Sequence, residues 1–223
     1  MLGEILFDVF RRGRSKPDRM WDGQSLLNVG GGSKEIPIPA HYAGWRHLLL
    51  DVDATGAPDI VCDARTLNSL APEQFDAVYC SHNLEHYYAH DALKVLRGFR
   101  HVLKADGFVE IAVPDLDCVM RHAVAQGLGL DDILYRSPAG PIAVIDVIYG
   151  FRRQIEQSGR DFYAHKTGFG PASLRATLER SGFESVVIVP RPEQFEVRAF
   201  AFKSPSTDDQ RRRLGIDIPG AMR

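Results

Sequence analysis

Short hydrophobic runs alternate with polar and glycine-containing stretches from residue 26 onward. The runs that resemble buried strands are Leu26–Val29, His47–Asp51, Asp59–Cys62, Phe75–Cys80 and Phe108–Val113. Between the last two of them, apolar residues recur at helical spacing from Leu84 to Val102. Strands that alternate with helices predict an α/β fold with a mainly parallel sheet and helices on both faces.

The end of the chain predicts a helix followed by two neighbouring strands. The helix covers Pro171–Ser181, and the strands cover Glu184–Val189 and Glu196–Phe202. Only a short, proline-containing loop joins the two strands, so they are expected to pair antiparallel. Residues 115–170 interrupt the regular rhythm with a helix-like piece and glycine- and proline-rich turns. We interpret them as a lid or acceptor platform at the ligand-binding edge of the sheet.

Residues 1–25 and 204–223 stand apart from the domain predicted over 26–203. In the first segment, apolar side chains from Leu2 to Phe10 share one helical face, and basic residues follow. This amphipathic extension is expected to cap the domain, to lie on a membrane surface, or to pack on a partner, including a second copy in a homodimer. The second segment holds Arg211, Arg212 and Arg213 and is expected to be a flexible tail.

Two chemical features coincide at the ends of the first two strands. Three glycines, Gly30, Gly31 and Gly32, follow the first strand directly. Without a Cβ, Gly30 and Gly32 let a ligand approach bare backbone. Asp51 ends the second strand about 20 residues later, the separation expected for an acid that holds ribose hydroxyls. The pattern therefore predicts an enzyme with a nucleotide-type cofactor.

Phosphate-containing cofactors fit the glycine loop poorly. A dinucleotide site would place its third glycine where this chain has Glu35, and Pro37 and Pro39 break the helix that should follow. No Gly-Lys-Ser/Thr sequence follows the glycines. S-adenosylmethionine carries no phosphate, and it needs bare backbone and an acid for its ribose. It is the cofactor that these residues favour.

Six segments, in order and at matching spacing, resemble class I S-adenosylmethionine-dependent methyltransferases of the small bacterial methyltransferase-domain type. They are Leu27–Gly32, Trp45–Asp53, Ile60–Ala64, Phe75–His86, Val102–Leu116 and Gly168–Phe183. The resemblance covers residues 26–203 and is loosest between 120 and 165. It implies a Rossmann-like, doubly wound sheet of seven strands whose last strand is antiparallel.

The resemblance also implies roles for individual residues. Gly30 and Gly32 would lie against the methionine part of the cofactor, and Asp51 would bind the ribose. Asp63 would accept a hydrogen bond from the adenine amino group, with the backbone of Ala64 nearby, although it could instead cap the helix of the following segment. The segment beneath the sulfonium would be Cys80, Ser81 and His82. The chain departs from the family at Asn28, a position that is often acidic, and at Lys34, where many relatives have a third glycine.

Three residues are candidates for the chemistry of transfer. His86 could act as a general base or orient the acceptor, or it could bond a backbone carbonyl as a structural residue. Asp115 ends the fifth strand, where acceptor groups often meet the cofactor, but it could also cap the helix that follows. His82 lies beside the expected sulfonium. Candidate walls of the acceptor pocket are Tyr87, Tyr88, Tyr149, Tyr163 and His165.

Two alternatives remain open beside the methyltransferase. A domain of the same fold could bind the cofactor, or nothing, without catalysing a reaction. The sequence His82-x-x-Glu85-His86 also matches the zinc-binding pattern of an inverted metalloprotease, which needs a helix and a third ligand. The methyltransferase resemblance accounts for the same residues without a metal.

Composition narrows the partners. The net charge is −2, and no basic groove with interleaved aromatic residues is evident, so nucleic acid is not expected. No apolar run approaches the length of a membrane span, and no signal peptide is recognisable. The three cysteines match no zinc spacing and favour a reducing compartment, hence a cytoplasmic protein. By elimination, the expected acceptor is a small molecule or a glycan precursor.

Overall fold

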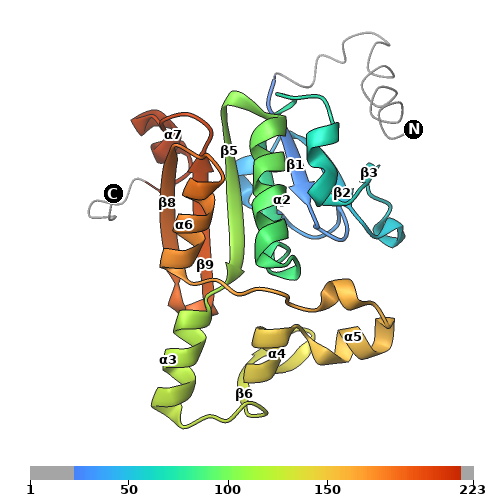
Figure 1. The fold of residues 1–223 in the computed structure, drawn as a ribbon, viewed down its shortest axis with the longest axis vertical. Coiled ribbons are helices and arrows are strands. Elements are labelled where there is room, and N and C mark those ends of the chain that lie inside the picture. Colours follow the sequence, from blue (N-terminus) through green and yellow to red (C-terminus); the bar gives the residue numbers. More distant parts are fainter. Residues whose placement is uncertain (1–22, 217–223) are drawn as a thin grey trace.

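The computed structural model describes residues 23–216, in which a central sheet of seven strands carries most of the core (Figure 1). The strands of this sheet are β1 (Ser25–Val29), β2 (Arg46–Asp51), β3 (Ile60–Val61), β4 (Phe75–Ser81), β5 (Leu103–Pro114), β8 (Ser185–Arg191) and β9 (Glu196–Phe202). Every strand predicted from the hydrophobic pattern is present. The predicted seven-stranded α/β sheet is therefore confirmed.

The strand order is β3-β2-β1-β4-β5-β9-β8. Neighbouring strands are parallel from β3 to β5, whereas β9 pairs antiparallel with both β5 and β8. The single antiparallel strand is the last one of the chain, as expected. The order reverses between β1 and β4, and ligands of open α/β sheets bind at the carboxyl ends of the strands at such a reversal.

One face of the sheet is covered by helices and the other mainly by loops. The elements on the first face are η4 (Ala64–Ser69), α2 (Ala89–Val102) and α6 (Pro171–Arg180), and they share one hydrophobic cluster with the sheet (Figure 1). On the second face, the cluster includes Tyr42 from the short helix η2 (Ala40–Tyr42) and Ile216. The prolines before η2 account for the lack of a long helix there.

The helix predicted from Leu84 begins later than its apolar spacing indicated. Residues Leu84–His86 form the single turn η5, the chain is then extended at Tyr87 and Tyr88, and α2 starts at Ala89. This interruption leaves the residues between β4 and α2 as a loop at the carboxyl edge of the sheet.

Residues 115–170 form a separate layer at that edge, drawn at the bottom of Figure 1. Its elements are α3 (Leu116–Gln126), the hairpin of β6 (Ile133–Ser137) and β7 (Gly140–Ala143), α4 (Val144–Tyr149), α5 (Arg152–Ser158) and η6 (Asp161–Tyr163). The layer has a hydrophobic cluster of its own, to which Val119, Leu134 and Val147 contribute. We call residues 115–170 the insert.

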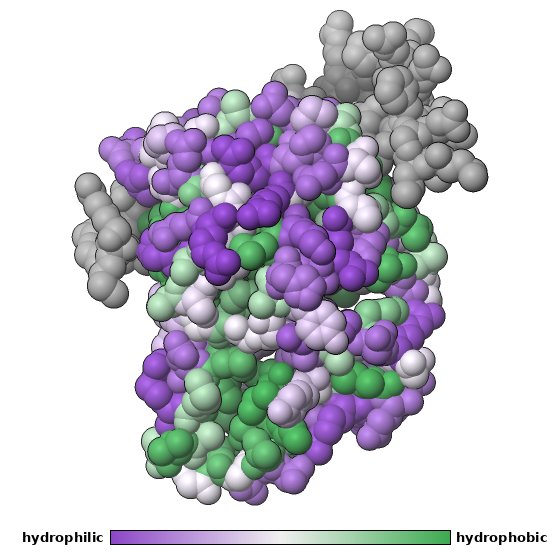
Figure 2. Space-filling view, viewed as in Figure 1, coloured by the Kyte–Doolittle hydropathy of each residue, from purple (hydrophilic) through white to green (hydrophobic). Residues whose placement is uncertain are grey.

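Hydrophobic side chains reach the surface at the lower end of the molecule, over α3 and the hairpin (Figure 2). Met120, Val124 and Ile133 are among the exposed apolar residues there. A helix long and apolar enough to cross a membrane does not occur among residues 23–216.

The sequence predicts that both ends of the chain lie outside the domain. Residues 1–22 of the predicted amphipathic extension lie outside the described residues, as do 217–223 of the predicted tail. The described part of that tail forms α7 (Asp208–Arg213), after which Ile216 packs into the second-face cluster. Gln210 also donates a hydrogen bond to the carbonyl of Asp106, 3.0 Å away. Residues 204–216 are thus packed against the sheet.

Candidate active site

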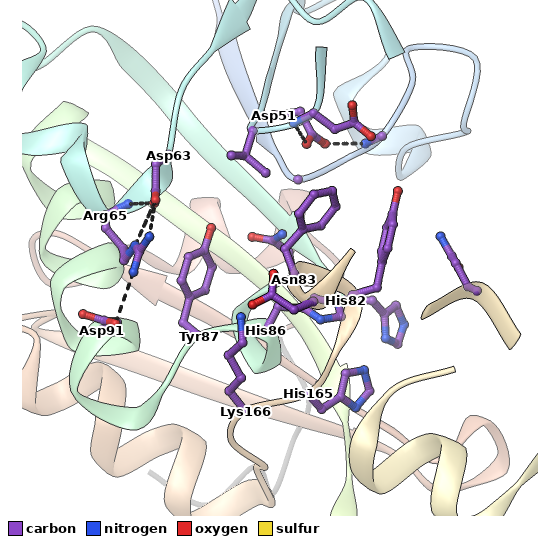
Figure 3. A pocket seen from close by; sticks show the side chains of 18 of the residues that line it. Asp51, Asp63, Arg65, His82, Asn83, His86, Tyr87, Asp91, His165 and Lys166 are labelled. Carbon is purple, nitrogen blue, oxygen red and sulfur yellow. Dashed lines mark hydrogen bonds and ion pairs between the residues drawn. The ribbon is translucent and has the colours of Figure 1, made fainter. Parts of the chain in front are cut away.

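A cleft of about 890 Å³ lies between the carboxyl edge of the sheet and the insert (Figure 3). From the sheet side it is lined by Gly30, Gly32, Asp51, Val52, Asp53, Thr55, Gly56, Asp63, Arg65, His82, Asn83, His86, Tyr87, Tyr88 and Asp91, and from the insert by Phe151, Gln154, Asp161, Phe162, Tyr163, His165 and Lys166. The loops after β1, β2, β3 and β4 all contribute. The cleft therefore occupies the position that the strand order predicts for a ligand.

The glycine loop has the backbone that its sequence predicted. Gly30 has φ +71° and Gly32 φ +68°, a region that favours glycine. A Cβ on Gly30 would lie 2.2 Å from the side-chain nitrogen of Asn83, and a Cβ on Gly31 2.3 Å from that of Asn28. Two amide side chains thus pack directly on bare glycine backbone. Asn83 lines the cleft, whereas Asn28 is buried behind the loop.

Asp51 joins the glycine loop to the end of β2. Its Oδ2 accepts a hydrogen bond from the backbone N–H of Gly32 (3.0 Å), and its Oδ1 accepts one from Asp53 (2.9 Å). A carboxylate has about four acceptor positions, so both oxygens keep capacity for hydroxyl donors. The carboxylate is thereby held in a fixed position at the cleft, as expected for a ribose ligand.

Asp63 is at the cleft but is already engaged. Its carboxylate caps η4 by accepting from the backbone N–H of Arg65, and it pairs with the Arg65 guanidinium at 2.6 Å. The hydrogen bonds from Arg65 hold the pKa of Asp63 below its ordinary value. Arg65 also approaches Asp91, 3.5 Å away, so that the three side chains form one row along the cleft wall (Figure 3).

Several predicted site residues are not among those that line the cleft. Ala64 and Cys80 are buried in the main core, and burial raises the pKa of the Cys80 thiol. Asp115 is also buried, and its Oδ1 accepts from the backbone N–H of Cys118 at the start of α3. The structure thus places Asp115 in the capping role. Outside the cleft lining are Asn28, Gly31, Ala64, Cys80, Ser81 and Asp115.

His82 lies between two carboxylates. Its Nε2 is 3.1 Å from Glu196, and its Nδ1 is 3.6 Å from Glu85. Burial alone would lower the pKa of His82, but the hydrogen bond to Glu196 and the charges of Glu196 and Glu85 raise it to about 10. His82 is therefore a cation at neutral pH, which favours a structural or electrostatic role over that of a proton acceptor.

His86 and His165 meet on the insert side of the cleft. Their ring centroids are 4.9 Å apart and the rings are inclined at 68°. The Nδ1 of His86 is 3.2 Å from the carbonyl of Ala164, and that of His165 is 2.9 Å from the carbonyl of Val147. A carbonyl only accepts, so each Nδ1 carries a proton, and Nε2 is the ring nitrogen that can offer a lone pair. Burial lowers the pKa of His165.

The scaffold of an inverted metalloprotease is absent from this region. His82 has φ +48° and precedes the single turn Leu84–His86, so His82 and His86 do not share a face of an α-helix. The structure therefore does not support a hydrolase that uses His82, Glu85 and His86 as this motif would.

The cleft lining contains predicted wall residues and others that the sequence did not predict. Of the five predicted wall residues, Tyr87, Tyr88, Tyr163 and His165 line the cleft and Tyr149 does not. Asn83, Arg65 and Phe162 were not expected. Asn83 lies two residues after the end of β4, a position that could have identified it. Arg160 of the insert also pairs with Asp53 across the mouth of the cleft.

Comparison with known proteins agrees with this geometry. Residues 27–111 match the family model described as a methyltransferase domain. No curated protein sequence matches the chain significantly. Among solved structures, a SAM-dependent methyltransferase from Archaeoglobus fulgidus is 16% identical with a TM-score of 0.50, over 88% of this chain and 94% of that one.

Two further structures share the fold. A protein from Pyrococcus horikoshii OT3 is 14% identical with a TM-score of 0.51, over 89% of this chain and 88% of that one. A structure described as PigF with SAH is 13% identical with a TM-score of 0.51, over 81% of this chain and 50% of that one. Residues 27–111 thus resemble a methyltransferase domain in sequence, and the described part of the chain shares its fold with these solved structures.

Proposed function

We propose that this protein transfers a methyl group from S-adenosylmethionine to a small-molecule or glycan-type acceptor. The observation that carries the proposal is the cleft itself, where bare glycine backbone and a fixed Asp51 carboxylate face residues of the insert. Its volume of about 890 Å³ lies near the upper end of the range for small-molecule sites, which suits a nucleoside cofactor together with a second small ligand.

The cofactor would lie along the sheet side of the cleft. Gly30 and Gly32 would contact its methionine part, and Asp51 would accept from the ribose hydroxyls. Asn83, which packs on Gly30, would offer an amide to the polar end of the methionine. Asp63 would receive the adenine amino group on an oxygen that also binds Arg65. These assignments follow the family resemblance and the lining of the cleft.

The cofactor supplies an activated methyl group, because its sulfonium is already a good leaving group. The protein then has to align the acceptor and exclude water. The insert would provide the acceptor platform, since Phe151, Phe162 and Tyr163 line the side of the cleft opposite the glycine loop. His86, whose Nδ1 donates to the Ala164 carbonyl, presents Nε2 as the proton acceptor for an acceptor hydroxyl.

A reducing, cytoplasmic setting belongs to the same proposal. Cys62, Cys80 and Cys118 are all free, and two of them are buried. Such cysteines are typical of proteins that work where thiols stay reduced.

Calorimetry with S-adenosylhomocysteine tests the cofactor assignment. We expect the wild-type protein to bind it, and Asp51→Ala to weaken binding by about 1–3 kcal/mol, because a charge-assisted bond is lost at a buried site. Asp106→Ala, which removes a carboxylate on the far edge of the sheet, is the matched control and should bind as the wild type does. A wild-type protein that does not bind at millimolar ligand contradicts the proposal.

Catalysis requires a second experiment. Extract fractions would be incubated with a labelled methyl donor and either the wild-type protein or Asp51→Ala. Label that enters a small molecule or glycan only with the wild type supports transfer. Tight binding of S-adenosylhomocysteine with no labelled product in any fraction would favour a cofactor-binding domain without activity.

A further inference from the structure

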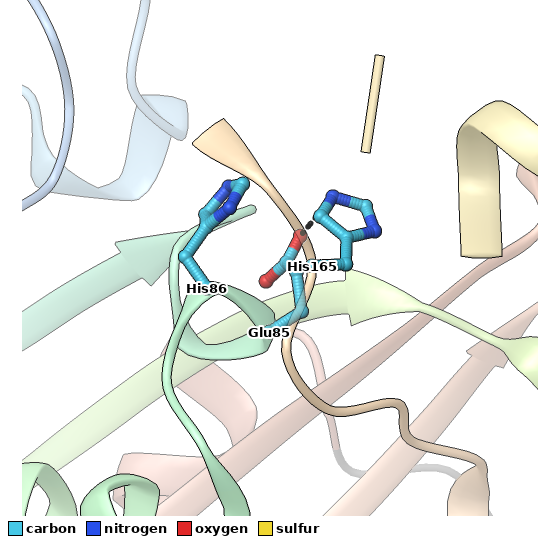
Figure 4. A group of neighbouring side chains, drawn as sticks. All are labelled: Glu85, His86 and His165. Atoms are coloured by element: carbon cyan, nitrogen blue, oxygen red, sulfur yellow. Dashed lines mark ion pairs between the residues drawn. The ribbon is translucent and has the colours of Figure 1, made fainter. Parts of the chain in front are cut away.

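Three potential metal ligands converge beside the cleft. Their ligand atoms, one each from Glu85, His86 and His165, all lie within 4.8 Å of one another (Figure 4). His86 and His165 line the cleft, whereas Glu85 lies behind them in the protein interior. Binding of a nucleoside cofactor along the glycine loop assigns no role to Glu85.

Glu85 is a buried carboxylate without hydrogen-bond donors. The residue is 1% exposed, and neither of its side-chain oxygens accepts a hydrogen bond from the described residues. The nearest cationic or imidazole nitrogens are His82 Nδ1 at 3.6 Å and His165 Nε2 at 4.0 Å from Oε1. His82 places a positive charge near one side of this carboxylate without a hydrogen bond, so the cost of burying it is only partly offset. A metal ion between Glu85, His86 and His165 would bind its free oxygens.

Both histidines make the kind of backbone hydrogen bond that metal-bound histidines make. Each donates its Nδ1–H to a backbone carbonyl, His86 to Ala164 and His165 to Val147. Such bonds fix the tautomer and leave Nε2 free to bind a metal, and metal-bound histidines nearly always have a partner of this kind. The Nε2 of His165 is directed toward Glu85, as the dashed line in Figure 4 marks.

The backbone holds the three ligands in place. Glu85 and His86 belong to η5, and His165 comes from the insert. The carbonyl of Glu85 accepts from the N–H groups of Lys166 (2.8 Å) and Thr167 (3.2 Å), which ties the insert to η5 beside His165. His165 itself donates to the carbonyl of Tyr149, 3.0 Å away. The cluster is therefore formed by the fold and does not depend on a flexible side-chain arrangement.

We propose that Glu85, His86 and His165 bind one divalent first-row transition-metal ion at the insert side of the cleft. Two imidazoles and one carboxylate suit Zn²⁺, Mn²⁺ or Fe²⁺, whereas Mg²⁺ and Ca²⁺ prefer sites made of oxygen alone. Three protein ligands leave coordination positions open, as in metal sites that bind a further ligand. Because the histidines line the cleft, those positions face the space for the acceptor.

A consequence for the acceptor rests on the proposed methyltransferase function. An acceptor with a hydroxyl or carboxylate oxygen could complete the coordination of the ion. The ion would then orient that oxygen and favour its deprotonated form, with the proton released to water, so that His86 would act as a metal ligand and not as the proton acceptor.

Metal binding is tested without any methyl transfer. Chelator-treated protein would be titrated with Zn²⁺ by calorimetry and with Co²⁺ by visible absorption, which reports the ligand field. We expect roughly one ion per chain, and a loss of affinity of at least about tenfold in both His86→Ala and His165→Ala. His90→Gln is the matched control, because His90 is exposed and outside the cluster. It should bind the ion as the wild type does.

The variants also separate the possible outcomes. Circular dichroism establishes that each variant is folded, and Glu85→Gln keeps the shape of the side chain should either alanine variant fail to fold. Absence of binding in the folded wild type, or equal binding in the wild type and the cluster variants, would overturn the proposal. Metal binding that is lost in the cluster variants supports the metal site even if the protein does not bind S-adenosylhomocysteine. The metal site and the proposed function are therefore tested independently.

Discussion

At the scale of single residues, Gly30 meets several structural requirements that the sequence pattern alone does not distinguish. Gly30 was expected to be bare so that a ligand could approach, yet in the structure Asn83 lies against it. Its positive φ is a second reason for glycine. Glycine at this position therefore allows the turn, the contact with Asn83 and the approach of the proposed cofactor.

Substitution of Gly30 distinguishes these requirements. We expect Gly30→Ala to lower the free energy of unfolding by roughly 1–3 kcal/mol, because the new Cβ meets Asn83 in a left-handed backbone. It should also weaken S-adenosylhomocysteine binding, since Asn83 must move into the cleft. Chemical denaturation and calorimetry measure the two effects.

Gly127 offers the matched control. It has φ +65° at the end of α3, but a Cβ there would meet nothing within 4 Å. Gly127→Ala should therefore cost only the backbone strain of about 1–2 kcal/mol and leave ligand binding unchanged. If both variants bind the ligand equally well, the close approach at Gly30 does not contribute to ligand binding.

At the scale of elements, the first turn of α3 decides between two roles for Asp115. Its carboxylate accepts from the N–H of Cys118 and lies outside the cleft lining. Asp115→Ala should destabilise the protein by about 0.5–2 kcal/mol through loss of the cap, whereas Asp115→Asn should cost much less, because asparagine caps helices well. Thermal unfolding and the rate of methyl transfer would be measured for both. A large loss of rate in a stable Asp115→Asn protein would instead indicate a catalytic carboxylate.

The corner between β7 and α5 depends on one buried acid. Asp146 accepts from the backbone N–H of Ala143 (2.9 Å) and from Nε of Arg152 (2.9 Å). Burial alone would raise the pKa of Asp146, but these hydrogen bonds lower it below its ordinary value. A lowered folded-state pKa means that the stabilisation is complete above the unfolded-state pKa of about 3.9 and is lost as the pH falls through the folded-state value.

A pH series with Asp146→Asn follows from this sign. At pH 7 the variant should unfold more easily than the wild type by about 1–3 kcal/mol, because the hydrogen bonds to a charged group are weakened. The difference should begin to shrink below about pH 4, where the carboxyl of the unfolded wild type takes up a proton, and should be lost as the pH falls through the lowered folded-state pKa. Denaturation at a series of pH values measures it. A difference that persists unchanged at low pH would show that shape and not charge matters at this corner.

The elements also explain what the sequence could and could not predict. Strands such as Leu26–Val29 are found because their burial pattern is local, and Asp51 is found because its distance from the glycines is fixed by one strand-turn-strand unit. His165 was expected only as a wall residue, since its partner Glu85 is 80 positions away and meets it through the path of the insert. The pairing of Asp63 with Arg65 could not be predicted, because it depends on side-chain geometry.

At the scale of the whole molecule, the cleft lies between the sheet and the insert, each of which has its own hydrophobic packing. The sheet has hydrophobic clusters on its two faces, and the insert has its own cluster beneath the carboxyl edge. The residues proposed to bind the cofactor belong to the sheet and its loops, and most residues proposed for the acceptor side belong to the insert. The glycine loop, which resembles a known family, is thus separated from the insert, where the resemblance is loosest and the acceptor would be selected.

The second face of the sheet depends on the end of the described chain. No long helix covers this face within residues 23–216, and Ile216 is 4% exposed in the cluster that also contains Tyr42 and Phe202. We expect Ile216→Ala to lower the free energy of unfolding by about 2–4 kcal/mol, as for other large-to-small changes in a core. Ile133→Ala makes the same chemical change at a side chain that is 48% exposed, and it should cost less than about 1 kcal/mol. Denaturation curves for both variants give the comparison. Equal, small effects would mean that residues 204–216 form a tail that does not contribute to the core, whereas the expected difference makes them part of the domain.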